Sequence, residues 1–262
     1  MRPQLNTNVS MEPSRVLLIL GGGANIGASV ARAFAANGYK VAVTSRTARP
    51  NGEAGVDLHV QGDLSDPSSV PSIFQKVVQS LGPPSVVVYN GQHDTLSLSA
   101  PSVTFNSNTR NHIAAAATPN PPDDPLALSV EDLNRDLQVN TTSVLVAARE
   151  ATALFATLPA SAPRAFIYTG NVLNKRVIAP LLGLGIGKSA TAHLIASASQ
   201  VYGPKGYRFY YADERQADGS PVYKDISGPA AGEFYSQLAE SGDRIPWEAT
   251  FVAGKGYVDF SQ

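Results

Sequence analysis

Cysteine is missing from this chain, and charged residues are scarce. The absence of cysteine excludes disulfide bonds, thiol catalysis and cysteine-ligated metal sites. Asp, Glu, Lys and Arg together make up 16% of the 262 residues, and the net charge is −1. An average protein has about a quarter of such residues. We therefore expect neither nucleic acid nor an anionic membrane surface as a partner.

Long hydrophobic runs are also missing. No apolar run approaches the ~18 residues that a membrane-spanning helix needs. Residues 1–14 are polar, contain two prolines and have no hydrophobic segment of the signal-peptide type. We therefore expect a flexible leader over 1–14 and a soluble, cytoplasmic domain over 15–262, without a metal. With 43% hydrophobic residues, the chain can build one large core.

A glycine-rich turn follows the first apolar run. Residues 17–20 are apolar, residues 21–27 read Gly-Gly-Gly-Ala-Asn-Ile-Gly, and a helical pattern then continues to Asn37 and Gly38. Such a turn lets the backbone approach a ligand closely, and the helix start that follows favours a phosphate. The pattern is typical of the nucleotide-binding turn of an open parallel sheet.

Strand and helix patterns alternate along the rest of the chain. This alternation predicts a single-domain α/β fold, a doubly wound parallel sheet of Rossmann-like type with about seven strands and helices on both faces. Residues 92 to about 128 interrupt it as a long loop or lid. After 17–20, we expect strands near 39–44, 56–61, 85–91, 164–170, 207–212 and 250–252, and helices near 26–37, 66–81, 129–158, 186–200 and 228–240.

The order and spacing of several residues resemble the short-chain dehydrogenase/reductase family over roughly residues 15–212. In that family the pyrophosphate lies on the glycine turn, which the resemblance assigns to Gly21, Gly23, Asn25, Ile26 and Gly27. A residue after the third strand contacts the adenine, here Asp63, and residues after the fourth strand flank the cofactor, here Asn90 and Gly91. A lysine, here Lys188, hydrogen-bonds the nicotinamide ribose. It also marks Asn140 in the long helix.

Two departures concern the cofactor site. Leu20 replaces a family threonine before the turn, and Asn25 replaces its middle glycine; we expect the turn to survive because asparagine tolerates left-handed backbone. Arg46 stands just past the second strand, where an acidic residue would select the 2′-hydroxyl of NAD. A guanidinium there suits a 2′-phosphate, so we expect NADP(H). A solvated surface arginine is the alternative.

The catalytic tyrosine of the family's Tyr-x-x-x-Lys pattern is missing. Four residues before Lys188 the chain has Leu184, which has no proton to donate. Asn140 and Lys188 remain as catalytic candidates. Asn171, after the fifth strand, and Asp213, after the sixth, are further candidates at the same sheet edge, although loop solvation explains both equally well.

Three other features carry less weight. His193 lies about 140° around the helix from Lys188, so it should not share a pocket with it. Tyr168 lies in a buried strand and is expected to be core. The Gly187-Lys188-Ser189 sequence ends like a phosphate-binding loop, but it lacks the first glycine of that motif and follows the wrong strand.

Three functions remain open. The first is an NADP(H)-dependent reductase of an acceptor that needs no tyrosine acid, such as an iminium ion or a conjugated carbonyl in a bulky hydrophobic secondary metabolite. The second is a redox-neutral cyclase or isomerase that keeps NADP as a structural element, and the third is a non-enzymatic NADP sensor. The resemblance also implies a homo-oligomer, a dimer or tetramer, formed through the long helix and the helix after the fifth strand.

Overall fold

The computed structural model describes residues 15–48, 53–91, 118–240 and 245–260. The predicted doubly wound parallel sheet is confirmed, with an additional short eighth strand among these residues that pairs antiparallel. The strands are β1 (Val16–Leu20), β2 (Lys40–Ser45), β3 (Leu58–Gln61), β4 (Val86–Tyr89), β5 (Ala165–Thr169), β6 (Arg208–Arg215), β7 (Glu248–Val252) and β8 (Gly256–Tyr257). Their order in the sheet is β3-β2-β1-β4-β5-β6-β7-β8.

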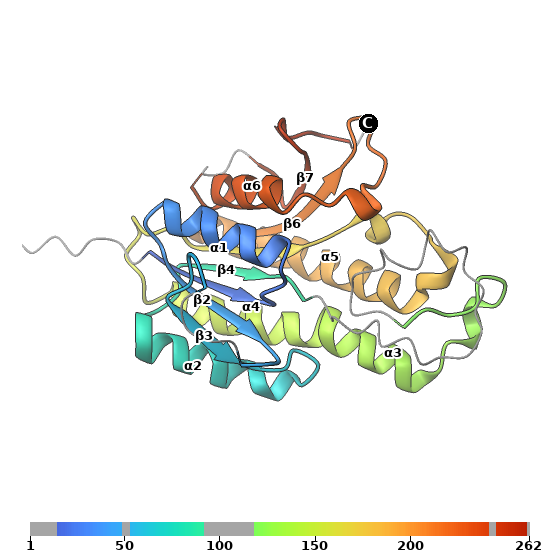
Figure 1. Cartoon of the computed structure of the whole chain (residues 1–262), viewed down its shortest axis with the longest axis horizontal. Helices are drawn as coiled ribbons and strands as arrows, with labels where there is room; N and C mark the ends of the chain where they lie inside the picture. The colour runs from blue at the N-terminus through green and yellow to red at the C-terminus, as the bar shows by residue number, and fades with distance from the viewer. Residues whose placement is uncertain (1–14, 49–52, 92–117, 241–244, 261–262) are drawn as a thin grey trace, which may run out of the picture.

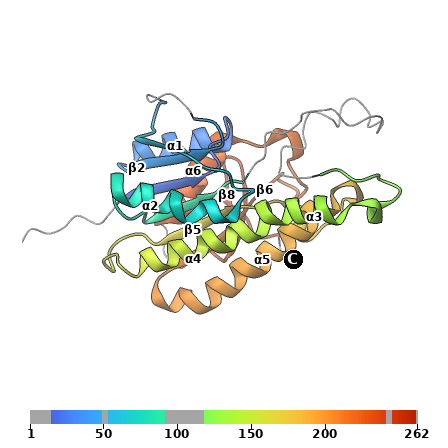
Figure 2. The same ribbon diagram turned by 90° about the horizontal axis from the view of Figure 1, so that it is seen from below.

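Helices cover both faces of the sheet (Figures 1 and 2). The α-helices are α1 (Ile26–Ala36), α2 (Val70–Leu81), α3 (Val130–Leu137), α4 (Ser143–Phe155), α5 (Leu182–Tyr202) and α6 (Gly228–Glu240). The side chains of β1 alternate between two cores: Leu17 and Ile19 pack with α1 and α6, whereas Leu18 and Leu20 pack with α2, α4 and α5. A strand buried on both faces reads as a continuous apolar run, which is why the sequence identified it.

Two helix starts follow their sequence signals. Asp66 accepts a hydrogen bond from the backbone N–H of Ser68 at 3.0 Å, ahead of a short 3₁₀ turn that leads into α2. Ser129 accepts one from the N–H of Asp132 at 3.0 Å and so caps α3. Both caps satisfy N–H groups that have no partner within the helix.

The long helix expected over 129–158 is not continuous. A π-helical segment, Gln138–Thr142, separates α3 from α4. Two backbone carbonyls of this segment accept hydrogen bonds from side-chain hydroxyls outside it. The Tyr89 hydroxyl donates to the carbonyl of Val139 at 2.6 Å, and the Thr191 hydroxyl donates to the carbonyl of Asn140. These long-range partners could not be read from the local pattern, and π segments of this kind occur often at functional sites.

Two other boundaries differ from expectation. The sixth strand runs on to Arg215, because β7 pairs with it as far as Arg215 and Val252; Asp213 therefore lies within the strand, not in a loop after it. The helix expected at 186–200 begins at Leu182, so Leu184 lies in its first turn.

The interruption at 92–128 is described only from residue 118 onward, and the expected leader 1–14 lies outside the described residues. Asn120 fixes the described end of the interruption to the start of α5. Its side chain accepts from the N–H of Leu182 at 3.1 Å and donates to the carbonyl of Ala179 at 2.8 Å. This end of the interruption therefore lies beside the helix that carries Lys188.

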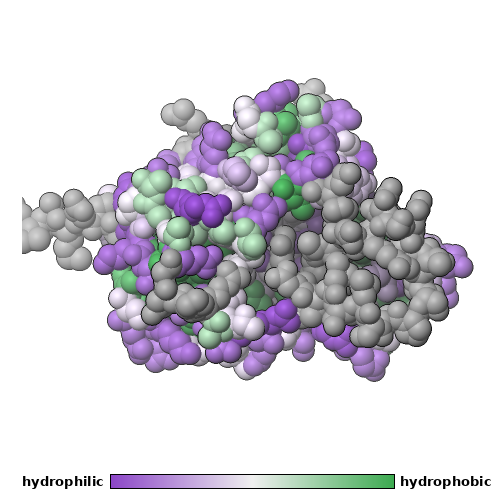
Figure 3. Space-filling view, in the orientation of Figure 1, coloured by the Kyte–Doolittle hydropathy of each residue, from purple (hydrophilic) through white to green (hydrophobic). Residues whose placement is uncertain are grey.

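In the described part of the chain, no helix is long and apolar enough to cross a bilayer. On the face shown in Figure 3, hydrophilic residues predominate around the rim, and hydrophobic residues show between them nearer the centre.

Candidate active site

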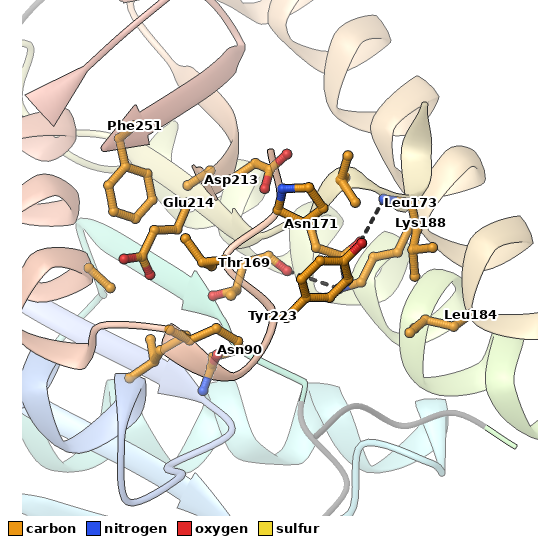
Figure 4. A pocket seen from close by; sticks show the side chains of 18 of the residues that line it. Asn90, Thr169, Asn171, Leu173, Leu184, Lys188, Asp213, Glu214, Tyr223 and Phe251 are labelled. Carbon is orange, nitrogen blue, oxygen red and sulfur yellow. Dashed lines mark hydrogen bonds between the residues drawn. The ribbon is translucent and has the colours of Figure 1, made fainter. Parts of the chain in front are cut away.

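Two cavities lie at the carboxyl edge of the parallel strands, and Gly91 lines both. The first, which we call the turn cavity, has a volume of about 490 Å³ and is lined by Gly21–Gly23, Thr44–Thr47, Gly62–Ser65, Gly91 and Val139. The second, which we call the lysine cavity, has a volume of about 220 Å³; its lining includes Asn90, Thr169, Asn171, Leu184, Lys188, Asp213, Glu214 and Tyr223 (Figure 4). Open parallel sheets bind their ligands at this edge. Here the turn cavity lies toward β1, β2 and β3, and the lysine cavity lies toward β5 and β6, with the end of β4 between them.

The glycine turn is packed so closely that larger residues do not fit. Gly21 has a φ of 103°, and a Cβ there would collide with the backbone carbonyl of Asn90. A Cβ on Gly22 would collide with the side chain of Val43. The first turn of α1 begins directly after this loop, and its first residue, Ile26, lines the lysine cavity. A helix N-terminus at this position favours an anion.

Arg46 and Asp63 line the turn cavity from the ends of β2 and β3. The amide of Gln61 donates to the carbonyl of Arg46 at 2.9 Å and fixes the backbone there. A carboxylate oxygen of Asp63 accepts from the N–H of Ser65 at 2.9 Å. The fold therefore brings the glycine turn, the arginine and the aspartate to one cavity, although they are far apart in sequence.

Asn90 connects the two cavities. Its side-chain amide donates to the carbonyl of Gly21 at 2.9 Å, which ties the end of β4 to the glycine turn. The residue is fully buried, and its side-chain oxygen accepts no hydrogen bond from the described residues. A buried acceptor of this kind is costly unless a ligand or water donates to it.

Lys188 projects into the lysine cavity from α5. Its ammonium donates to the carbonyl of Thr169 at 3.0 Å and lies 4.5 Å from the ring centre of Tyr168. Burial lowers its pKa to about 7, and the nearby Asp213 carboxylate opposes that shift. Leu184, one helical turn earlier, lines the same cavity and is 2% exposed.

Asn140 lies in the π segment next to α5 but is absent from the lining of either cavity. Its side-chain amide donates to the carbonyl of Asp136 at 3.0 Å, and a Cβ on Gly187 would crowd it. The side chain of Asn140 therefore bonds back to α3, whereas its backbone carbonyl accepts from the Thr191 hydroxyl of α5. Tyr168 is core, as expected, and His193 is exposed on α5 away from the cavity lining.

Asn171 and Asp213 both line the lysine cavity, and both are engaged. The side-chain oxygen of Asn171 accepts from the N–H of Leu173 at 3.0 Å. Asp213 is 2% exposed and pairs with Arg215 through two nitrogens at 2.5 and 2.7 Å. Burial raises the pKa of Asp213, and Arg215 partly offsets the rise. The expectation that loop solvation could explain Asp213 is wrong, because its strand is buried.

Asn25 has a role that its sequence position did not suggest. Its φ is −89°, so the turn does not use the left-handed backbone that we expected. Its side chain instead donates to the carbonyl of Ile226 and accepts from the N–H of Gly228, each at 3.0 Å. Asn25 thus fastens the segment between β6 and α6 to the nucleotide turn.

Two further cavity residues, which were not among the sequence-predicted candidates, lie in or beside this segment, residues 216–227. Glu214, in β6 just before the segment, lines the lysine cavity, and burial raises its pKa to about 7. Tyr223 lines the cavity as well and has a φ of 47°, the one positive φ among the described non-glycine residues. A tyrosine after Pro221 and Val222 gave no periodic signal, so the pattern offered no means of finding it.

Comparison with known proteins decides the family. The pattern described as short chain dehydrogenase matches residues 15–161. A curated relative, the short chain dehydrogenase/reductase dmxR12 of Cryptosporiopsis sp., is 47% identical over 247 residues, 94% of this chain and 95% of the relative. The chain belongs to the short-chain dehydrogenase/reductase family. It is a dehydrogenase/reductase-type oxidoreductase on a Rossmann-like sheet.

Solved structures share the fold of this short-chain dehydrogenase. BdcA in complex with NADPH has a TM-score of 0.67 at 17% identity, over 94% of this chain and 96% of BdcA. An NADH-dependent reductase, A1-R′, complexed with NAD has a TM-score of 0.68 at 15% identity, over 92% and 95% of the two chains. The fold alone therefore accommodates both nicotinamide cofactors.

Proposed function

We propose that this short-chain dehydrogenase is an NADP(H)-dependent reductase of an acceptor that needs no acid at position 184, either an iminium ion or a conjugated carbonyl. The observation that carries the proposal is the position of Leu184. It lies one turn before Lys188 and lines the same cavity, where the family pattern would have a tyrosine. An iminium ion becomes a neutral amine on reduction, and a conjugated carbonyl spreads its charge to an oxygen remote from the reacting carbon, so neither needs a proton at Leu184.

The cavities suit a dinucleotide. The two cavities meet at Gly91, so one extended ligand can occupy both. In this proposal the turn cavity holds the adenosine half against the glycine turn and Asp63, and the buried oxygen of Asn90 receives a hydrogen bond from the ligand. Lys188 holds the nicotinamide ribose. When bound, NADPH supplies a hydride.

Arg46 favours the phosphorylated cofactor. It lines the turn cavity beside Thr44 and Thr47, at the end of β2. A guanidinium there pairs with a 2′-phosphate through charge-assisted hydrogen bonds, which a 2′-hydroxyl would form less strongly.

Deuterium transfer tests the reductase proposal. The purified protein is incubated with 4-deuterated NADPH and, in turn, a 3,4-dihydroisoquinolinium ion, 4-phenyl-3-buten-2-one and acetophenone. We expect deuterium in the product from the iminium ion or the enone, together with loss of cofactor absorbance, and at least about 100-fold slower ketone reduction. A product of unchanged mass without cofactor loss would replace the proposal with redox-neutral chemistry, and fast ketone reduction would contradict the role assigned to Leu184.

A further inference from the structure

The segment between β6 and α6 holds Tyr223 in an unfavourable backbone conformation. A φ of 47° is rare and unfavourable for a bulky residue. Such residues gather at functional sites, where the surrounding structure holds them in place. Tyr223 is 60% exposed, so its own burial does not account for the conformation.

The segment is fastened at both ends. At its start, the Arg215 side chain donates to the carbonyl of Gly219 at 3.0 Å, and the backbone of Arg215 forms an isolated antiparallel β-bridge with Pro221. At its end, Ser227 donates its backbone N–H to Glu214 at 2.9 Å, and Asn25 binds the backbone just beyond Tyr223. The segment that carries Tyr223 is therefore tied to β6 and to the glycine turn on either side of that residue.

Several other polar side chains of the lysine cavity are already engaged, and the unsatisfied side-chain oxygen of Asn90 is an acceptor with no proton to give. Asp213 is paired with Arg215, Asn171 caps a turn, and Thr169 accepts from the Tyr235 hydroxyl at 3.1 Å. In Figure 4, Glu214 lies on the Phe251 side of the cavity, whereas the Tyr223 ring lies on the side of Lys188. Among the described residues, the Tyr223 hydroxyl makes no hydrogen bond, so it is available to a ligand.

We propose that Tyr223 is the proton donor of this enzyme and that its acceptor is a conjugated carbonyl rather than an iminium ion. The inference rests on the proposed reductase function and narrows its substrate class, because a phenol hydroxyl stabilises a developing oxyanion and offers nothing to a cation. Its location also explains how a family member can have leucine at position 184: the acid comes from a different segment of the chain.

The carbon–carbon double bond of the acceptor receives the hydride from NADPH at its far carbon, and the electron pair of that double bond moves to form an enolate. The enolate oxygen takes the proton of the Tyr223 hydroxyl, which leaves a phenolate. Water reprotonates the phenolate, since the ring is exposed, and the enol becomes the saturated carbonyl in solution. NADPH is oxidised and the acceptor is reduced by two electrons.

Tyr223→Phe tests the proposal, because it keeps the ring and removes only the hydroxyl. With 4-phenyl-3-buten-2-one and NADPH, we expect kcat to fall about 10²–10⁴-fold, the usual contribution of a general acid. NADPH affinity should not change. Tyr202→Phe, on α5 outside the cavity lining, is the matched control and should keep full activity.

A binding measurement supplies a readout independent of turnover. 4-Nitrophenolate is a planar, conjugated oxyanion that resembles the enolate, and its absorbance reports its binding. We expect Tyr223→Phe to weaken its binding at least about tenfold, equivalent to one hydrogen bond to a charged group, and to leave nitrobenzene binding unchanged. Equal affinities for 4-nitrophenolate in the two proteins would overturn the proposal.

The outcomes separate this inference from the proposed function. If the wild-type protein reduces the enone and Tyr223→Phe does so equally well, Tyr223 is not the acid while the reductase function stands. If only the iminium ion is reduced, the conjugated carbonyl is the wrong substrate class and the reductase function again stands. If neither is reduced despite NADPH binding, both are overturned.

Discussion

The side-chain oxygen of Asn25 accepts a hydrogen bond from the backbone N–H of Gly228 at 3.0 Å, although 203 residues separate them. The same side chain donates to the carbonyl of Ile226. A Cβ on Gly228 would collide with Asn25, so the two residues are fitted closely to each other. The glycine turn is therefore linked by hydrogen bonds to the segment that carries Tyr223.

We expect Asn25→Gly, which would restore the glycine of the family pattern, to weaken the attachment of residues 216–227 to the glycine turn. Loss of both hydrogen bonds should lower the free energy of unfolding by about 1–3 kcal/mol and expose residues 216–227 to proteolysis. Urea denaturation and limited proteolysis measure the two effects. Asn37→Gly, at the other end of α1, is the control for glycine's backbone entropy; equal losses in both variants would show that the Asn25 contacts contribute nothing.

Arg46→Ala tests the cofactor preference. Because Arg46 lines the turn cavity where a 2′-phosphate would lie, we expect NADPH affinity to fall about tenfold or more. NADH affinity should change little. Fluorescence titration with each cofactor gives both dissociation constants, and Arg135→Ala on the exposed part of α3 is the control. Equal losses for NADPH and NADH would contradict the preference.

The sequence predicted the elements whose signals are local. Continuous apolar runs identified the buried strands, and the helices expected from residues 66 and 129 begin close to those positions, with Asp66 and Ser129 as N-caps. The glycine turn could be assigned because close packing leaves no room for a Cβ at Gly21 and Gly22. Arg46, Asp63, Asn90 and Lys188 were found through family spacing, and the structure brings them to adjacent cavities at one edge of the sheet.

The features that the sequence did not predict depend on partners far along the chain. The π segment at Asn140 is bound by hydroxyls from β4 and α5, and Asp213 lies in a strand because β7 pairs beside it. Tyr223 enters the cavity through a positive φ that no periodic pattern encodes. Local sequence therefore located the residues of the turn cavity and Lys188 much better than the contribution of Tyr223 and of β6 to the lysine cavity.

Glu214→Gln should change stability in a pH-dependent way. Burial raises the pKa of Glu214 from 4.5 to about 7, so the folded protein binds this proton more tightly than the unfolded chain. The stability cost of the charged form grows as pH rises through this window and is complete above it. We expect Glu214→Gln to raise the free energy of unfolding by roughly 1–2 kcal/mol at pH 8 and to have little effect near pH 4.

Thermal denaturation at several pH values measures this difference. Glu233→Gln, exposed on α6, removes the same charge without the burial and serves as the control. A gain for Glu214→Gln that is equal at pH 4 and pH 8 would argue against a raised pKa in the folded protein.

Tyr223→Gly should stabilise the protein while removing its proposed acid. Glycine adopts a φ of 47° without steric cost, and the exposed ring loses little buried area. Relief of ~1–3 kcal/mol of backbone strain should exceed the roughly 0.5–1 kcal/mol that glycine's greater freedom in the unfolded chain costs. We expect the free energy of unfolding to rise by about 1 kcal/mol. Val222→Gly is the control, because the φ there is −76° and the same change should destabilise. Loss of stability in both variants would mean that Tyr223 is not strained.

Leu184→Tyr should add ketone reduction to the enzyme. The new hydroxyl would lie in the lysine cavity one helical turn from Lys188, where it can protonate an alkoxide as hydride arrives. We expect acetophenone reduction to rise about 10²–10⁴-fold over wild type. Leu184→Phe adds a similar ring without the hydroxyl, so a gain of equal size there would assign the effect to cavity shape. If Leu184→Tyr binds NADPH normally and gains nothing, then position 184 does not face the reacting carbon, and the absence of tyrosine there does not determine which acceptor the enzyme reduces.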